Sequence, residues 1–399
     1  MSTRLSRTTA FARKFLFFGI IAIVVLTTTQ LITYKPVTVK PTIRPSGTST
    51  TQDGCTAPDS KYSSLPAIKI KSLSLSPGTK AIFSADRSTA KFPTFPSSAY
   101  VYKLSKIYEK LDDVDTAKLV AQNLGFNSNP TSSTDGSLTW SNQNETKFLA
   151  FDKAKFSWNM STDFNKYELT MLGDKTDVYQ KLNESVIMSI SLINKSYSTT
   201  EAEYTYIVRK NDNSLANVGN LLQANILSTN YYKVLPLATC EGSGSSRETT
   251  HTSRIISPEY LDQSLNVQLS GSNLNIAESL VSLKMREFEL ATEDAAIYPT
   301  ITMAEAFLLL QTNKGILYWL LPDNGNIFSK YEEQKVKEFR IATDSTKIVY
   351  LEPQQYIEND ESTQYYQPYY QFVGQATLEN DKMANFIFLV RALDPNSYI

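Results

Sequence analysis

The longest apolar run of the chain lies close to its start. Residues 15–26 include no polar side chain, and residues 27–34 extend the run to about the length that crosses a bilayer. Basic residues precede it without an acidic residue among them, at Arg4, Arg7, Arg13 and Lys14. This charge pattern favours a cytoplasmic N-terminus and predicts a single-pass membrane anchor over residues 15–34. A cleaved signal peptide is the alternative, although the residues after the run make a poor cleavage site.

The next stretch, residues 35–68, carries few large apolar side chains. Prolines are spread through it among threonines and serines, from Pro36 to Pro58. Such a segment cannot offset its chain entropy by burial. We therefore expect residues 35–68 to form a semi-extended stalk between the membrane and the folded part.

The rest of the chain alternates between helical and strand periodicity. Apolar residues at three-to-four spacing predict an amphipathic helix over residues 174–193. Thr302 and Glu305 form a capping box before a second apolar helix. Short connections favour an antiparallel meander for the strands expected near 335–341, 347–352, 367–377 and 385–392.

A helix that feeds an antiparallel sheet is typical of the α+β class. The pattern thus predicts an N-terminal transmembrane helix followed by helix-plus-antiparallel-meander units. The similar order of elements in residues 116–160 and 303–352 suggests that this unit is duplicated. The expected segments are a basic tail 1–14, the anchor 15–34, the stalk 35–68, a first α+β unit 69–170, a middle α+β region 171–298 with a polar loop 241–253, and a C-terminal helix plus antiparallel sheet 299–399.

The C-terminal unit resembles a known family. The helix 302–311, the break at 313–315, the strand that ends at 350–353 and the segment 367–374 are similar to bacterial YycH/YycI-type exported domains, which are PepSY-like modules. The match covers roughly residues 300–395 and consists of short apolar and aromatic positions. The resemblance implies a regulator with one N-terminal transmembrane helix that binds other membrane proteins without catalysis. The longer stalk and the unmatched middle region depart from the family pattern.

Composition narrows the classes of partner. The chain has 39 basic and 40 acidic residues and a net charge of −1, and four of its positive charges lie before residue 15. The remaining part is therefore acidic, which speaks against nucleic-acid binding. Two cysteines occur, Cys55 and Cys240. A disulfide between them, two free thiols and pairing between chains are the alternatives, and an oxidising compartment permits the bond.

No catalytic, cofactor-binding or metal-binding set is visible in the sequence. His251 is the only histidine, and a solvated loop position explains it better than a catalytic triad, which needs a nucleophile and an acid beside the histidine. One histidine and two separated cysteines do not make a zinc site. Acidic clusters at 293–294, 332–333 and 358–361 lack calcium-loop spacing. The sequence contains no glycine-rich phosphate loop.

The tyrosines near the C-terminus are the best functional lead. Tyrosine is enriched at protein interfaces, although ordinary pairing across a sheet is the alternative explanation of such a cluster. The candidate interface consists of Tyr350, Tyr365, Tyr366, Tyr369, Tyr370 and Phe372.

These observations favour a membrane-anchored extracytoplasmic binding or regulatory protein without catalysis. Its expected partners are the cytoplasmic membrane, through residues 15–34, and another membrane or envelope protein. A structural subunit of a cell-envelope assembly is the alternative. An exported enzyme that depends on carboxylates or on a Ser/Lys pair is the third hypothesis. No cofactor is expected.

Overall fold

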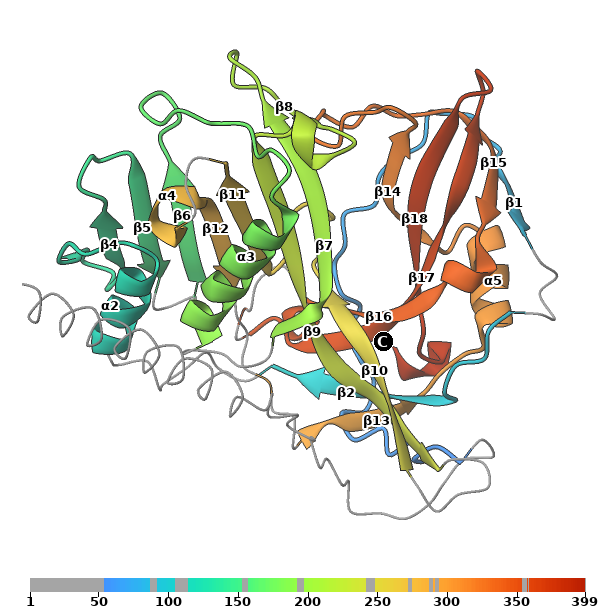
Figure 1. Cartoon of the computed structure of the whole chain (residues 1–399). Helices are drawn as coiled ribbons and strands as arrows, with labels where there is room; N and C mark the ends of the chain where they lie inside the picture. Colours follow the sequence, from blue (N-terminus) through green and yellow to red (C-terminus); the bar gives the residue numbers. More distant parts are fainter. Residues whose placement is uncertain are drawn as a thin grey trace, which may run out of the picture. The chain divides into compact units, whose positions relative to one another are not determined.

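The structure is a computed structural model. It describes residues 54–86, 92–104, 114–152, 157–191, 197–241, 248–271, 275–286, 290, 294–353, 357 and 359–398. Within these ranges the chain forms eighteen strands, which are connected through their ladders. Two regions can be distinguished by their pairing, and we call them the first and the second sheet (Figure 1).

The first sheet is antiparallel throughout. Its strands in spatial order are β3 (Thr131–Ser132), β4 (Leu138–Ser141), β5 (Lys147–Asp152), β6 (Ser157–Thr162), β12 (Leu280–Arg286), β11 (Leu265–Ser270), β9 (Ile226–Glu241), β7 (Tyr197–Arg209) and β8 (Leu215–Asn217). Alternate residues of β5 and β6, such as Leu149, Trp158 and Met160, are buried, as expected for a sheet with one covered face.

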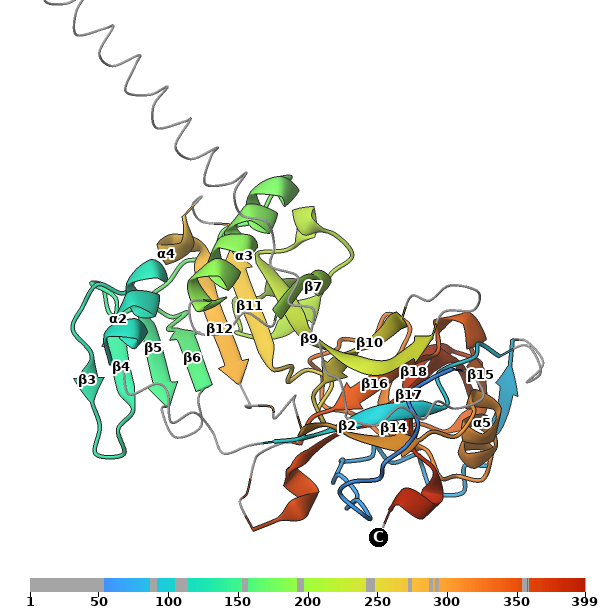
Figure 2. The same ribbon diagram turned by 90° about the horizontal axis from the view of Figure 1, so that it is seen from below.

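Helices cover that face of the first sheet (Figure 2). They are α2 (Val114–Asn123), α3 (Thr176–Ser191) and the short α4 (Ile276–Ser279). Val120 of α2 and Val186 of α3 belong to the same buried cluster as Trp140 of β4 and Val267 of β11. The core of this region thus lies between the helices and the sheet.

The second sheet is mixed. Strand β17 (Tyr365–Leu378) is its longest, and it pairs antiparallel with β18 (Met383–Arg391), β15 (Val336–Ile341) and β16 (Lys347–Leu351). The other members are β14 (Ile316–Pro322) on β18, β1 (Ile82–Ala85) parallel to β15, β10 (Glu248–Ile256) parallel to β16, β2 (Ser98–Lys103) on the start of β17, and β13 (Ala296–Pro299) on β2. Helix α5 (Met303–Gln311) begins at the predicted capping box of Thr302 and Glu305.

Strand β9 belongs to both regions. Residues 226–231 pair with β11 in the first sheet, and residues 234–241 pair with β10, whose end continues into the second sheet. Strands from all three predicted α+β segments therefore contribute to the same pair of sheets. Of the predicted polar loop 241–253, residues 248–253 are part of β10, and residues 242–247 lie outside the described residues.

The predicted fold class is wrong. The described part is a large mixed sheet, not a series of helix-plus-meander units behind a transmembrane helix. The error arises from long-range pairing, because β12 pairs with β6 as well as with β11 and so brings segments that are far apart in the chain into one sheet. The strands expected near 335–392 are present as β15 to β18, but β15 and β16 both pair with β17.

The described residues do not bear out the predicted single-pass topology and membrane location. Among the described residues, no helix has the length and apolar character needed to span a bilayer. The stretch that gave rise to the prediction, residues 15–34, lies outside the described residues, as does the basic tail 1–14.

The end of the predicted stalk is packed against the second sheet. Cys55, Leu65 and Ile68 are buried, and Leu65 N donates to Ser397 O at 2.7 Å. Tyr298 OH donates to Ser63 O at 2.8 Å. Residues 55–68 are thus part of the fold, because backbone hydrogen bonds and apolar burial hold them in place. Residues 35–53 of the predicted stalk lie outside the described residues.

Candidate functional site

All six candidate interface residues are buried. Their relative exposure is 7% or less. The hydroxyl of Tyr350 lies 2.8 Å from Tyr100 O and 3.0 Å from Pro236 O, and Tyr370 OH donates to Ile301 O at 2.7 Å. Burial raises the pKa of the Tyr350 hydroxyl well above its usual value. These side chains form a core around β17 and present no surface to a partner, which corrects the interface proposed for Tyr350, Tyr365, Tyr366, Tyr369, Tyr370 and Phe372.

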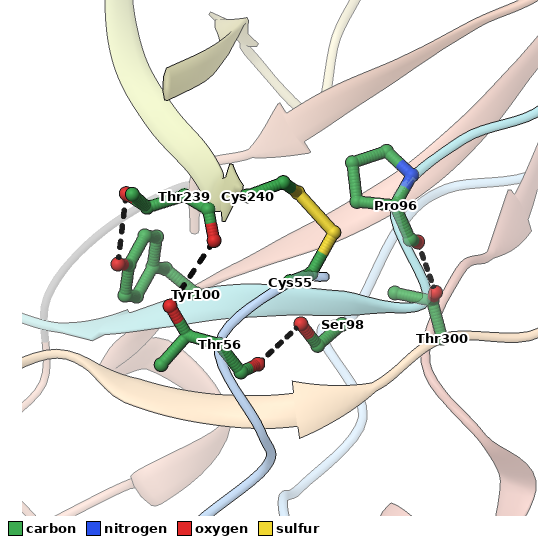
Figure 3. The surroundings of a disulfide bond; sticks show 8 residues. All are labelled: Cys55, Thr56, Pro96, Ser98, Tyr100, Thr239, Cys240 and Thr300. Carbon is green, nitrogen blue, oxygen red and sulfur yellow. Dashed lines mark hydrogen bonds between the residues drawn. A yellow bond between two sulfur atoms is a disulfide. The ribbon is translucent and has the colours of Figure 1, made fainter. Parts of the chain in front are cut away.

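The two cysteines are joined in a disulfide (Figure 3). Hydrogen bonds extend the connection, since Thr56 N donates to Thr239 O at 3.0 Å and Ser98 Oγ donates to Thr56 O at 2.7 Å. The bond ties Cys55 to β9 across a sequence separation of 185 residues. Its role at this position is structural, because both cysteines are buried.

The other residues singled out by sequence do not converge on a site. His251 is exposed, but it lies in β10 and not in a loop. Asp294 forms an exposed ion pair with Lys61, and Asp360 pairs with Lys69 at 3.2 Å. Glu332 and Glu333 are exposed. Within the ranges that the structure describes, no group of three His, Cys, Asp or Glu side chains is placed to hold a metal ion.

A groove of about 550 Å³ is the best candidate site in the described part. It is lined by β14, by residues 258–261 after β10, by residues 325–334 after β14, and by Lys71 and Leu73. Ligand sites in proteins have volumes of about 300–1,000 Å³ and combine aromatic walls with a few polar groups. The groove fits this description in both its volume and its lining.

Aromatic side chains form the floor of the groove. The ring of Tyr260 stacks on Trp319 with centroids 4.7 Å apart and planes inclined by 28°, and it meets Tyr318 edge-on at 6.0 Å. Tyr318 OH donates to Ser257 O at 2.7 Å. Burial raises the pKa of both Tyr260 and Tyr318, so both hydroxyls stay protonated at neutral pH. Tyr260 and Trp319 are only partly buried and offer ring surface to the groove.

A buried polar network fixes the loop that carries Tyr260. Glu352, whose side chain is 2% exposed, accepts from Ser257 Oγ at 2.6 Å and from Ser264 Oγ at 2.7 Å. Arg286 pairs with Glu352 and with Asp262, each at 3.1 Å. A buried carboxylate with several hydrogen bonds and a guanidinium partner holds its surroundings rigidly. The network thus links the ends of β10, β12 and β16 beneath the groove.

A second charged group lies close to Tyr260. Arg254 of β10 pairs with Glu203 of β7 and lies over the ring of Tyr232, 4.3 Å from its centroid. Tyr232 OH donates to Glu203 Oε2 at 2.7 Å. Burial would raise the pKa of Glu203, but the charge of Arg254 and these hydrogen bonds outweigh it and the pKa is lowered. Glu203 is therefore an ionised structural carboxylate, and its charge adds to the effect of burial in raising the pKa of Tyr260.

Charges of both signs surround the opening. The exposed ionic residues of the lining are Lys71, Lys330, Glu259 and Glu332. Because two lysines are balanced by two glutamates, the rim has no net charge that would attract a polyanion or a polycation. The arrangement suits a ligand that is neutral or carries mixed charge.

Sequence reasoning missed this site. Tyr260 is far in the chain from Tyr318 and Tyr331, and none of the three stands in a recognisable motif. The adjacent pair Tyr318 and Trp319 in a short apolar strand was the one local signal, and it gives no indication of the loop that packs against it.

No protein-family model matches the chain, and no curated protein matches it significantly. The resemblance to YycH/YycI-type domains therefore stays a prediction.

Proposed function

We propose that the protein is a binding protein without catalytic activity, and that the groove beside β14 is its ligand site. The observation that carries this proposal is the stack of Tyr260 on Trp319 in a loop held by the buried Glu352. A partly exposed aromatic surface on a rigid support lowers the entropic cost of binding, because little needs to be ordered when the ligand arrives.

The ionisable groups beneath the groove are engaged in structural contacts. Arg286 pairs with both Glu352 and Asp262, and Glu352 accepts from the hydroxyls of Ser257 and Ser264. A general acid or base has to reach the proton that it transfers, and these groups face the loop that they hold. Their arrangement therefore supports a role in positioning the loop.

A ligand screen tests the proposal. The full-length protein is titrated with a peptide library, a glycan array and a set of small metabolites, and binding is compared with that of Trp319→Leu. The matched control is Tyr204→Leu, which alters an aromatic residue that is 44% exposed on β7. The proposal expects at least one ligand class to bind the wild-type and control proteins and to lose affinity by about tenfold or more for Trp319→Leu. If every ligand found binds Trp319→Leu as well as the wild type, the groove is not the site.

A further inference from the structure

We infer that the groove binds an extended polypeptide segment of another protein, which adds as a strand to the outer edge of β14. This inference rests on the proposed function and names the class of its ligand. It depends on three features of the groove: the main-chain groups of β14 with which no described strand pairs, the path of residues 73–76, and the side chains of the lining.

The first feature is the pairing of β14. Its register aligns Trp319 with Ile387 and Leu321 with Asn385 of β18. Asp323 N continues this ladder by donating to Met383 O at 2.8 Å. In an antiparallel ladder the main-chain groups of alternate residues point to opposite sides. The N–H and C=O of Leu320 therefore point away from β18 and toward the groove, where no strand of the described ranges pairs with them.

The second feature shows that this edge accepts extended backbone. Leu73 N donates to Leu317 O at 2.8 Å on the outer side of β14. The same segment then crosses to the opposite wall, where Ser76 N donates to Gln334 O at 3.0 Å and Tyr331 OH donates to Ser74 O at 2.7 Å. A backbone contact of this chain with itself is thus present at one end of the edge. The groove continues the edge past Leu320 as far as Pro322, whose carbonyl accepts from Gly325 N at 2.8 Å.

The third feature is the chemistry of the lining. A strand that pairs with Leu320 places alternate side chains on the two faces of the sheet. Those on the groove side meet Tyr260 and Trp319, which favour aliphatic side chains or proline. The balanced rim of Lys71, Lys330, Glu259 and Glu332 complements a segment of mixed charge and disfavours a polyanion. Main-chain hydrogen bonds with an apolar side-chain pocket are the usual mode of strand addition.

The experiment uses backbone methylation of a selected peptide. A random-peptide phage library is selected on the full-length protein, with Trp319→Leu as the counter-selection target and Tyr204→Leu as the control. The best peptide is then synthesised with a single N-methyl group at each position in turn. N-methylation removes a main-chain donor, so methylation at positions that face β14 should reduce affinity by about tenfold or more, and methylation at the alternate positions should change it by less than about threefold.

The outcomes separate this inference from the proposed function. An alternating pattern supports strand addition. A peptide that tolerates N-methylation throughout, or a glycan or metabolite that binds through Trp319 while no peptide does, overturns strand addition and leaves the groove as a binding site. If every ligand class binds Trp319→Leu as well as the wild type, both strand addition and the proposed binding function of the groove are overturned.

Discussion

Two aromatic clusters of this protein differ in how much of their ring surface is exposed. The buried cluster on and around β17 includes Tyr350, Tyr369 and Tyr370, none of which is more than 1% exposed. The groove cluster consists of Tyr260, Tyr318 and Trp319, and the rings of Tyr260 and Trp319 are partly exposed. The first cluster contains several tyrosines that are close in sequence, and it is closed to solvent. The second cluster combines one loop residue with two neighbouring strand residues, and it is partly open. Density of tyrosine along the chain is therefore a poor guide to a binding surface.

The difference follows from what covers each cluster. Strand β17 is buried on both faces along residues 365–372, so neighbouring tyrosines of either orientation enter the core. Several hydroxyls there donate to carbonyls of remote strands, as Tyr102 OH does to Pro236 O, 2.7 Å away. In the groove cluster, Trp319 lies on the edge strand β14 and Tyr260 lies in the loop that packs against it, so part of both rings stays accessible.

The largest expected loss of stability comes from substitutions in the buried cluster. Replacing Tyr350 with Ala should lower the free energy of unfolding by about 3–5 kcal/mol, because a large cavity forms in the core. Tyr350→Phe retains the ring and should cost about 1–2 kcal/mol, since the carbonyls of Tyr100 and Pro236 lose a donor. Urea unfolding followed by circular dichroism measures both. Equal stability of the two variants would show that the packing of the ring has little importance.

The second-largest loss of stability is expected from a change in the polar network around Glu352. Glu352→Gln removes the charge that faces Arg286 inside the protein and should cost about 3 kcal/mol. Hydrogen exchange should also become faster in residues 257–264, because the loop loses its main support. The control is Asp381→Asn, which breaks an exposed pair with Lys337 and should cost less than about 1 kcal/mol. Unchanged exchange in the loop of Glu352→Gln would show that other contacts hold Tyr260.

Alkaline pH provides a third comparison. Burial raises the pKa of Tyr369 to about 12, against the opposing charge of Arg391. An unfolded tyrosine ionises near pH 10, so the folded state retains a proton that the unfolded state loses. The contribution of the protonated Tyr369 to the free energy of unfolding is fully present below about pH 10 and is lost as the pH rises through about 12. Over this pH range, the wild type should therefore lose about 2 kcal/mol more of its free energy of unfolding than Tyr369→Phe loses.

Urea unfolding at a series of pH values between about 8 and 12 measures this difference, with each protein referred to its own stability at the lowest pH. Parallel curves for the two proteins would mean that Tyr369 ionises as readily in the fold as in the unfolded chain.

The parts of the fold that could be predicted depend on local interactions. The capping box at Thr302 and the alternation in residues 335–392 specify α5 and β15 to β18, because their signals lie within a few residues. The insertion of β12 beside β6 could not be predicted, since Met160 and Leu283 meet only in the folded sheet. The groove escaped prediction for the same reason, because the position of Tyr260 depends on the contact between Ser257 and Glu352.

The smallest loss of stability is expected from a substitution of Tyr260. This variant tests whether the groove cluster is more open than the buried cluster. Tyr260→Leu removes the stacking on Trp319 and the contact with Tyr318 but keeps an apolar side chain. Such aromatic pairs contribute about 1 kcal/mol beyond their buried area, so the loss of stability in urea unfolding should be of that size.

Tryptophan quenching supplies a second measure of the same variant. The other two tryptophans, Trp140 and Trp158, are no more than 2% exposed, so acrylamide quenching reports mainly on Trp319. Removing the stacked ring uncovers the indole and should increase quenching. A loss of stability as large as that of Tyr350→Ala would place Tyr260 in a core like that of β17. Unchanged quenching would mean that Tyr260 does not shield Trp319. Either result would remove the contrast between an open and a closed aromatic cluster on which the proposed binding groove depends.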